Sequence, residues 1–223
     1  MAEAGYSVVL TYRSSQDEAE TLARSLPGEN HSVLPLSVGD SSSAQTLAEE
    51  VRKRYGRHDL LVNNAGMTRY VAHDDLDGLD DDLIDQVFRV NWRGAFACVR
   101  AFKALLLDGD GGLVVNISSI AGTTGEGSNV AYCASKAALD SMTRSLARAL
   151  APKIRVVSVA PGLVEGDYAK KLDPEWRQAQ IENTPLHRLA EAEDVANAVL
   201  ALATLLPFTT GNIIHIDGGR PLT

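Results

Sequence analysis

The sequence predicts an α/β fold built on a doubly wound parallel sheet. Strand and helix patterns alternate along nearly the whole chain of 223 residues. The strand patterns are short and apolar, without a polar residue at every second position, which is typical of strands covered on both faces. Hydrophobic residues make up 45% of the chain, enough to fill a large core. We therefore expect a single domain over residues 1–223, since α/β domains often reach this size undivided.

The first elements are a strand, a helix and a second strand. The apolar run at residues 8–11 predicts the first strand. A helix follows over residues 15–26, opened by a capping box of Ser15 and Glu18 and ended by a Pro-Gly pair. The strand at residues 33–36 contains a proline, which cannot donate to a ladder, so we expect this strand at a sheet edge.

The middle of the chain holds one strand between two helices. Residues 41–55 carry one apolar face at helical spacing, and residues 60–62 form a short apolar strand. A long helix is expected over residues 81–107, with its propensity interrupted at Asn91 and Gly94. The alternation of strand and helix therefore continues through this region.

The last part of the chain repeats the pattern and contains an irregular stretch. That stretch runs from the end of a strand to about residue 188 and shows no clear periodicity. The expected elements here are a strand ending before Ser119, a helix at 130–150, a strand at 154–159, a helix at 191–206 and a strand at 213–216.

One stretch carries recognisable chemistry, from Val114 to Lys136. Ser119 stands thirteen residues before Tyr132, and Tyr132 stands four residues before Lys136. A spacing of four places the phenol and the ammonium on one helix face. A phenol has a pKa of about 10, and a neighbouring ammonium lowers it by stabilising the phenolate. A Tyr four before a Lys arises by chance about 0.16 times in such a chain, so the pair needs its context.

The context comes from the ends of the expected strands. Asn63 to Gly66, Ser119 and the pair Pro161-Gly162 all follow strands directly. In a parallel sheet the ligand lies beyond the carboxyl ends of the strands. We therefore expect these residues to converge on one crevice.

In order and spacing, these motifs resemble the short-chain dehydrogenase/reductase family, in its branch of roughly 250-residue reductases. The match covers the chain from Gly5 onward. The motifs that carry it are Asn63-Asn64-Ala65-Gly66, Asn91, Ser119, Tyr132-Cys133-Ala134-Ser135-Lys136, Pro161-Gly162 and Asp217-Gly218-Gly219.

The resemblance implies a Rossmann-like sheet and a hydride transfer between a nicotinamide cofactor and a carbonyl carbon. It implies that Tyr132 is the catalytic acid and base, that Lys136 lowers its pKa and holds the cofactor ribose, and that Ser119 orients the carbonyl. Asn91 would position a proton-relaying water. The residues that it implies at the cofactor are Val38, Asn64, Ala65, Gly66, Tyr132, Lys136, Pro161, Gly162 and Val164.

The end of the first strand bears on the choice of cofactor. It reads Tyr12-Arg13-Ser14, with no acid to bond a ribose 2′-hydroxyl and one guanidinium suited to a phosphate. This favours NADP(H) over NAD(H). The alternative is that Arg13 is merely a solvated side chain at a helix entrance.

The sequence departs from the family pattern in three places. Gly166 stands where the family usually has a threonine, and Ser37 stands where it often has an aspartate. The first strand and the glycine-rich phosphate loop, expected ahead of Met1, are absent, and no other glycine cluster replaces the loop. Since that strand is central in the family, we expect two unpaired edges in mid-sheet and weak NADPH affinity. A non-catalytic relative or structural subunit is the alternative function, and a wrong start of the sequence is an alternative reading.

Composition limits the partners. A net charge of -8 and a pI near 5.1 disfavour nucleic acid and anionic membranes. No apolar run is long enough for a membrane span, no leader is recognisable, and neither Cys98 nor Cys133 suggests a disulfide, so we expect a cytoplasmic protein. By analogy with the family we expect a homodimer or homotetramer.

An acidic stretch bears on the class of substrate. Six aspartates lie between Asp74 and Asp82, without the glycine and glutamate spacing of a calcium loop, so no metal site is expected. If this stretch borders the crevice, it repels an acidic acyl carrier and favours a small free ketone or secondary alcohol. Tyr168, Trp176 and His187 lie in the stretch that sets specificity in the family, although ordinary packing is the favoured explanation for each of them.

Overall fold

The computed structural model describes residues 1–222 except 109–110 and 167–168, and it has the expected α/β architecture. Tyr168 lies outside the described residues. The strands are β1 (Val9–Tyr12), β2 (Ser32–Pro35), β3 (Leu60–Asn63), β4 (Gly112–Ile117), β5 (Ile154–Pro161) and β6 (Ile213–Ile216). The helices are α1 (Gln16–Ser25), α2 (Ser41–Tyr55), α3 (Asp81–Phe88), α4 (Ala95–Leu107), α5 (Ala121–Thr124), α6 (Val130–Leu150), α7 (Pro174–Glu182) and α8 (Ala192–Thr204). Short helical turns are η1 (Ala2–Ala4), the π-helix η2 (Arg89–Gly94), η3 (Ala169–Lys171) and η4 (Arg220–Leu222).

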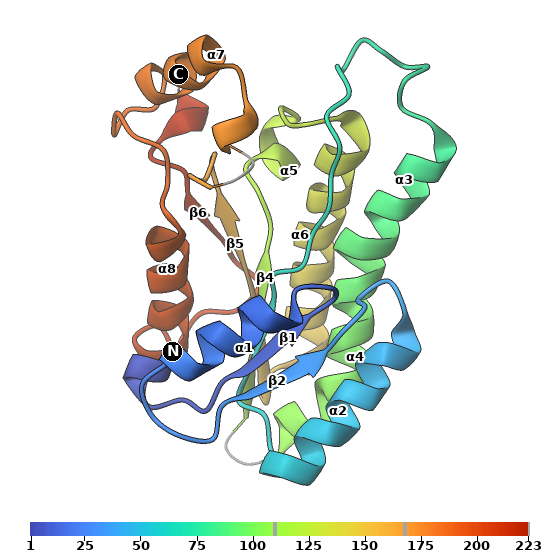
Figure 1. Cartoon of the computed structure of the whole chain (residues 1–223), viewed down its shortest axis with the longest axis vertical. Helices are drawn as coiled ribbons and strands as arrows, with labels where there is room; N and C mark the ends of the chain where they lie inside the picture. The colour runs from blue at the N-terminus through green and yellow to red at the C-terminus, as the bar shows by residue number, and fades with distance from the viewer. Residues whose placement is uncertain (109–110, 167–168, 223) are drawn as a thin grey trace.

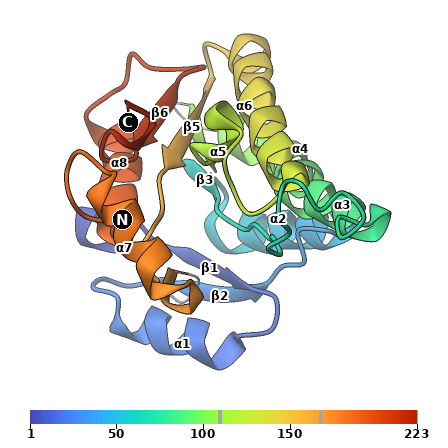
Figure 2. The same ribbon diagram turned by 90° about the horizontal axis from the view of Figure 1, so that it is seen from above.

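All strand pairs in the described chain are parallel, and they form two separate sheets. β1 pairs with β2, whereas β3, β4, β5 and β6 pair in that order. Pro35 therefore lies on an edge strand, as predicted. Neither β1 nor β3 has a second partner among the described residues, which confirms the expectation of two unpaired inner edges. Figure 2 shows β1 and β2 set apart from β3.

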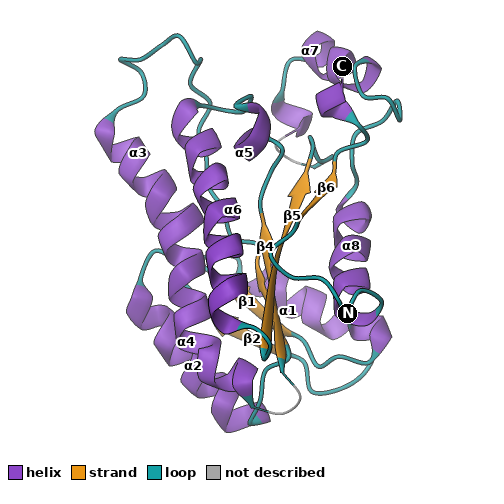
Figure 3. Cartoon of the chain, turned by 180° about the vertical axis from the view of Figure 1, so that it is seen from behind, coloured by secondary structure: helices purple, strands orange, loops and turns teal. Residues whose placement is uncertain are grey.

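Helices cover both faces of the larger sheet, as a doubly wound fold requires (Figures 1 and 3). Val114 and Val156 point into a core shared with α2, α4 and α6, while their neighbours Val115 and Val157 point into a core shared with α8. Adjacent residues of one strand face opposite ways, so both faces of β4 and β5 need apolar residues. The strand pattern without regular polar positions is thereby explained.

Several sequence predictions need correction. Ser15 makes no side-chain cap to α1, so the predicted Ser15-Glu18 capping box is absent. Helix α7 lies inside the stretch that looked irregular, and it begins with an Asp173 cap and Pro174 at its first turn. The predicted helix over residues 81–107 is continuous in space, but it passes through a π-helix at the two residues that weakened its propensity.

The start of the chain and the lengths of its helices add two observations. Gly5 has a left-handed backbone with φ of 83° and ends the turn η1, as a helix-ending glycine would. Within the described part of the chain, every helix is too short or too polar to cross a lipid bilayer.

Candidate active site

Tyr132 and Lys136 are held on the first two turns of α6. The helix begins where Asn129, fully buried, accepts a hydrogen bond from the Tyr132 backbone N–H at 2.7 Å. The Asn129 amide also donates to the Arg69 carbonyl at 2.6 Å, which ties the loop after β3 to this helix start. Sequence reasoning missed Asn129, although an Asn directly before an apolar-periodic run is a recognisable helix cap.

Lys136 is almost completely buried beside the tyrosine ring. Its side-chain nitrogen Nζ lies 5.7 Å from the centre of the Tyr132 ring and donates to the Ile117 carbonyl at 2.7 Å. Burial lowers the pKa of Lys136 from 10.5 to about 8, and the carboxylate of Asp140 partly counters that shift. A buried ammonium therefore lies next to the phenol, as the four-residue spacing predicted.

Asn91 meets the same region from the π-helix η2. Its side chain accepts from the Met67 N–H at 2.8 Å and donates to the Met67 carbonyl at 3.0 Å and to Ser135 Oγ at 3.0 Å. A Cβ placed on Gly66 would lie 3.5 Å from Asn91 Oδ1 and 3.8 Å from Lys136 Nζ. Asn91 thus holds the loop after β3 against the lysine.

Ser119 lies in the short loop between β4 and the short helix α5, two residues before Ala121. Its Oγ accepts a hydrogen bond from the Ala121 N–H at 3.2 Å, which leaves the hydroxyl proton available to a ligand. The next residue, Ile120, donates to the Pro161 carbonyl at 3.0 Å. This bond joins the loop of the predicted serine to the end of β5.

The other predicted residues at this edge occupy the ends of β3 and β5. Asn64 and Ala65 are exposed just beyond β3, so their backbone is open to a ligand. Gly162 donates to the Ile216 carbonyl of β6 at 3.0 Å, and Val164 forms an isolated bridge with Ala190. The structure therefore brings the predicted residues of β3, β4 and β5 to one edge of the sheet.

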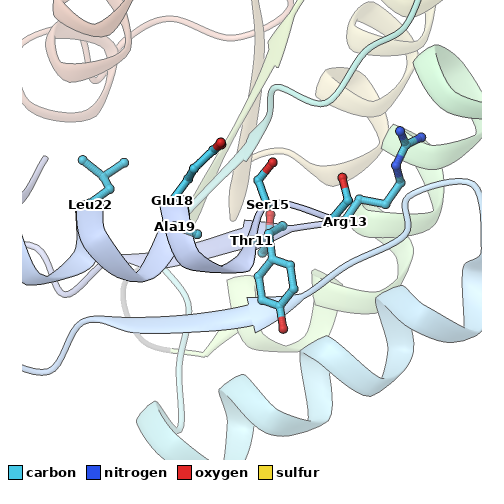
Figure 4. A pocket seen from close by; sticks show the side chains of 8 residues that line it. Thr11, Arg13, Ser15, Glu18, Ala19 and Leu22 are labelled. Carbon is cyan, nitrogen blue, oxygen red and sulfur yellow. The ribbon is translucent and has the colours of Figure 1, made fainter.

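Tyr12, Arg13 and Ser14 line a hollow of about 410 Å³ between β1 and α1 (Figure 4). The Arg13 side chain extends away from α1 in this view, and it forms no ion pair within the described chain. Glu18 lines the same hollow, so a carboxylate accompanies the guanidinium. The hollow thus offers one guanidinium, a group suited to a phosphate, together with one acid.

Val38 lies in the loop between β2 and α2, packed tightly against the π-helix. A Cβ on Gly94 would lie only 2.7 Å from the Val38 carbonyl oxygen, so this contact requires glycine. Arg93 donates to the neighbouring Gly39 carbonyl at 2.6 Å. The loop that carries Val38, which is predicted to lie at the cofactor, is thus anchored to the helix that carries Asn91.

A second hollow, of about 380 Å³, lies beside α5 and α6 and is separate from these residues. It is lined by His73, by α5 with the following Gly125, and by Cys133 and its neighbours on α6, but by neither Ser119 nor Tyr132. Burial raises the pKa of the Cys133 thiol. We place the chemistry at the strand ends because the hollow beside α5 offers no proton donor next to a buried cation.

These residues fit part of a nicotinamide dinucleotide. Lys136 Nζ, Gly66 and the exposed backbone of Asn64 suit a ribose, and Arg13 suits a ribose phosphate. Among the described residues, no cluster of glycines joins a strand to a following helix, which is where a diphosphate is usually held. The fit is therefore good at the two ends of the cofactor and poor in its middle.

Comparison with known proteins supports the same chemistry. A family model described as Enoyl-(Acyl carrier protein) reductase matches residues 1–220. The chain belongs to the short-chain dehydrogenase/reductase family. It is accordingly an NAD(P)-dependent oxidoreductase of that family.

Three known proteins that are similar to this short-chain dehydrogenase/reductase have different names and sources. It is 32% identical to a 3-oxoacyl-(acyl-carrier-protein) reductase of Staphylococcus aureus, over 98% of this chain and 89% of that protein. It is 37% identical to carbonyl reductase family member 4 of Danio rerio, over 100% of this chain and 90% of that protein. A gluconate 5-dehydrogenase from Burkholderia cenocepacia, solved with NADP and tartrate, is 27% identical, with a TM-score of 0.90 over 100% of this chain and 88% of that one.

Proposed function

We propose that this chain reduces the carbonyl group of a small free ketone with NADPH, and that it oxidises the corresponding secondary alcohol in reverse. The observation that carries the proposal is the buried Lys136 ammonium beside the Tyr132 ring, at the sheet edge that also holds Ser119. A phenol next to a buried cation is a competent proton donor. Burying an ammonium is costly, which favours a functional role for the pair over a merely structural one.

Each side chain has a role in this proposal. When bound, the nicotinamide supplies the hydride that the carbonyl carbon receives. Tyr132 gives its phenolic proton to the carbonyl oxygen, and Lys136 stabilises the phenolate that remains. The Ser119 hydroxyl donates to the same oxygen and orients it. Asn91 positions the water that returns a proton toward Lys136.

The acidic stretch supports a free rather than a carrier-bound substrate. Asp74, Asp75 and Asp77 are exposed, and their loop is tied to the segment before α6 by a contact at 3.0 Å between His73 Nε2 and the Gly127 carbonyl. Carboxylates near the start of the helix that holds Tyr132 repel an acidic carrier protein. A small neutral ketone meets no such barrier.

A substrate panel tests the proposal. With NADPH in large excess, small neutral ketones should be reduced faster than a 3-oxoacyl group on an acyl carrier protein, as followed by loss of nicotinamide absorbance. A preference for the carrier-bound substrate would overturn the substrate assignment. The absence of reduction with every carbonyl compound, despite NADPH binding in a fluorescence titration, would overturn the enzymatic function itself.

Arg13 should set the preference for NADPH. We expect Arg13→Ser to lower the ratio of kcat/KM for NADPH to that for NADH by about 10- to 100-fold, since hydrogen bonds to charged groups contribute about 1.5–3 kcal/mol. The matched control is Arg24→Ser, on the far end of α1 and outside the hollow. An unchanged ratio in Arg13→Ser would show that this guanidinium is only solvated.

A non-catalytic relative remains the second candidate function. In that case Ser119, Tyr132 and Lys136 are kept only as inherited scaffold. The substrate panel separates the two candidates, because only the first reduces a carbonyl compound.

We also propose that the protein is a cytoplasmic homodimer or homotetramer. Leu205 and Phe208, just after α8, are largely exposed at 75% and 105%. Large apolar side chains exposed together favour a protein contact. A second copy of the chain is the partner that we propose for them.

A further inference from the structure

Asp140 is a buried carboxylate that the proposed reaction does not use. It lies on α6 one helical turn after Lys136, is only 4% exposed, and its Oδ1 has no hydrogen-bond partner among the described residues. The next inward polar residue of the helix, Thr143, is fully paired, at 2.8 Å to Asn116 and 2.8 Å to Ser158. Buried polar groups are nearly always paired in this way, so the unpartnered Oδ1 of Asp140 needs an explanation.

We propose that Asp140 is a positioning residue, the buried counter-charge that keeps Lys136 in its ammonium form beside Tyr132. A spacing of four residues places the two side chains on one face of α6. The inference rests on the proposed function for its catalytic meaning, although the charge pairing can be measured without any reaction.

Among the described residues, no competing charge faces Lys136 from the elements packed around it. The residues of β4 and α5 are uncharged, and β5 contributes Arg155, whose guanidinium is bonded to the carbonyls of Leu202, Leu206 and Thr209. The acids of α3 and the arginines of η2 are exposed at the surface. On α6 itself, Tyr132 is the proton donor and the two arginines further along the helix are exposed. Asp140 is thus the carboxylate that acts on the ammonium.

The sign of the effect follows from burial. Desolvation lowers the pKa of Lys136 to about 8, and the negative charge of Asp140 raises it against that trend. Removing the charge therefore lowers the pKa of Lys136 further. A neutral Lys136 no longer stabilises the Tyr132 phenolate, so proton transfer weakens at neutral and alkaline pH but not in acid, where the lysine stays protonated.

NMR of protein labelled at lysine Cε measures this directly, in the absence of cofactor and substrate. The Lys136 signal is assigned from its loss in Lys136→Met. We expect Asp140→Asn to lower the pKa of Lys136 by about 1, as loss of a nearby opposite charge typically does. Asp140→Glu, which keeps the charge, and Thr143→Val, which removes a neighbouring buried hydroxyl, should leave that pKa nearly unchanged.

Two results would overturn the inference. One is a Lys136 pKa in Asp140→Asn that equals the wild-type value, and the other is a fall of the Lys136 pKa in Thr143→Val as large as that in Asp140→Asn. Circular dichroism checks that each variant is folded, and Asp140→Ser provides a second neutral variant if the asparagine is not tolerated. In the reductase assay, the rate of Asp140→Asn relative to wild type should fall only above about pH 7. If the wild-type protein has no reductase activity but Asp140→Asn still lowers the Lys136 pKa measured by NMR, the proposed function is refuted and the charge pairing stands.

Discussion

Replacing Tyr132 with phenylalanine should lower the ketone reductase rate by about 100- to 10,000-fold, the range in which general acid catalysis contributes. The ring stays, so its contact with the Lys136 ammonium at 5.7 Å and the packing of α6 are retained. The proton that the carbonyl oxygen needs is lost. Initial rates with saturating ketone and NADPH measure the effect, and the Tm should change little.

A matched control is Tyr55→Phe. The Tyr55 hydroxyl donates to the Asn30 carbonyl at 2.7 Å, far along the chain from the candidate active site, so its loss affects stability without touching the reaction. We expect near-normal kcat in this control. Full activity in Tyr132→Phe would refute the acid and base role of Tyr132.

The second large effect concerns the contact between α5 and α6. A Cβ on Gly122 would lie 2.9 Å from the Ala137 nitrogen and 2.9 Å from the Lys136 carbonyl carbon, both backbone atoms that cannot rotate away. Gly122→Ala should therefore destabilise the protein by about 1–3 kcal/mol, the usual cost of overpacking. That cost exceeds the gain of about 1 kcal/mol that alanine brings to a helix.

The same substitution should also reduce activity. α5 follows Ser119 directly, and α6 carries Lys136, so separating the two helices moves the serine hydroxyl away from the tyrosine and lysine. We expect kcat to fall by at least about tenfold, since small displacements in a catalytic site are costly. The control is Thr123→Ala in the same short helix, where the side chain is exposed. Equal Tm values for Gly122→Ala and Thr123→Ala would contradict the close approach.

Local patterns in the sequence predicted the elements that carry the site. The helix at 130–150 was predicted with its observed bounds because its apolar stripe is long. Helix α7 was not predicted because none of its residues is buried, so no apolar stripe marks it. The strand ends that meet at the site were predicted from the rule for parallel sheets, which needs only their order.

Other features depend on contacts between distant segments. The close approaches at Gly94 and Gly122 depend on the Val38 loop and on α6, so nothing in the neighbouring residues signals them. The unpaired state of Asp140 is equally invisible in the sequence, where a polar residue on a helix is usually on the surface. Asn129 is different, because an asparagine directly before an apolar-periodic run is a recognisable helix cap in the sequence.

The separate pairing of β1 with β2 has a consequence for local unfolding. Helix α1 has no buried residue, and β1 has a free backbone edge among the described residues, so little cooperative packing protects this unit. Its amides should exchange with solvent long before those of β4 and β5, which lie at the centre of both cores. Arg13 belongs to this least protected unit. Phosphate binding there would therefore also slow hydrogen exchange across β1 and α1, linking recognition of the cofactor to the ordering of its own binding site.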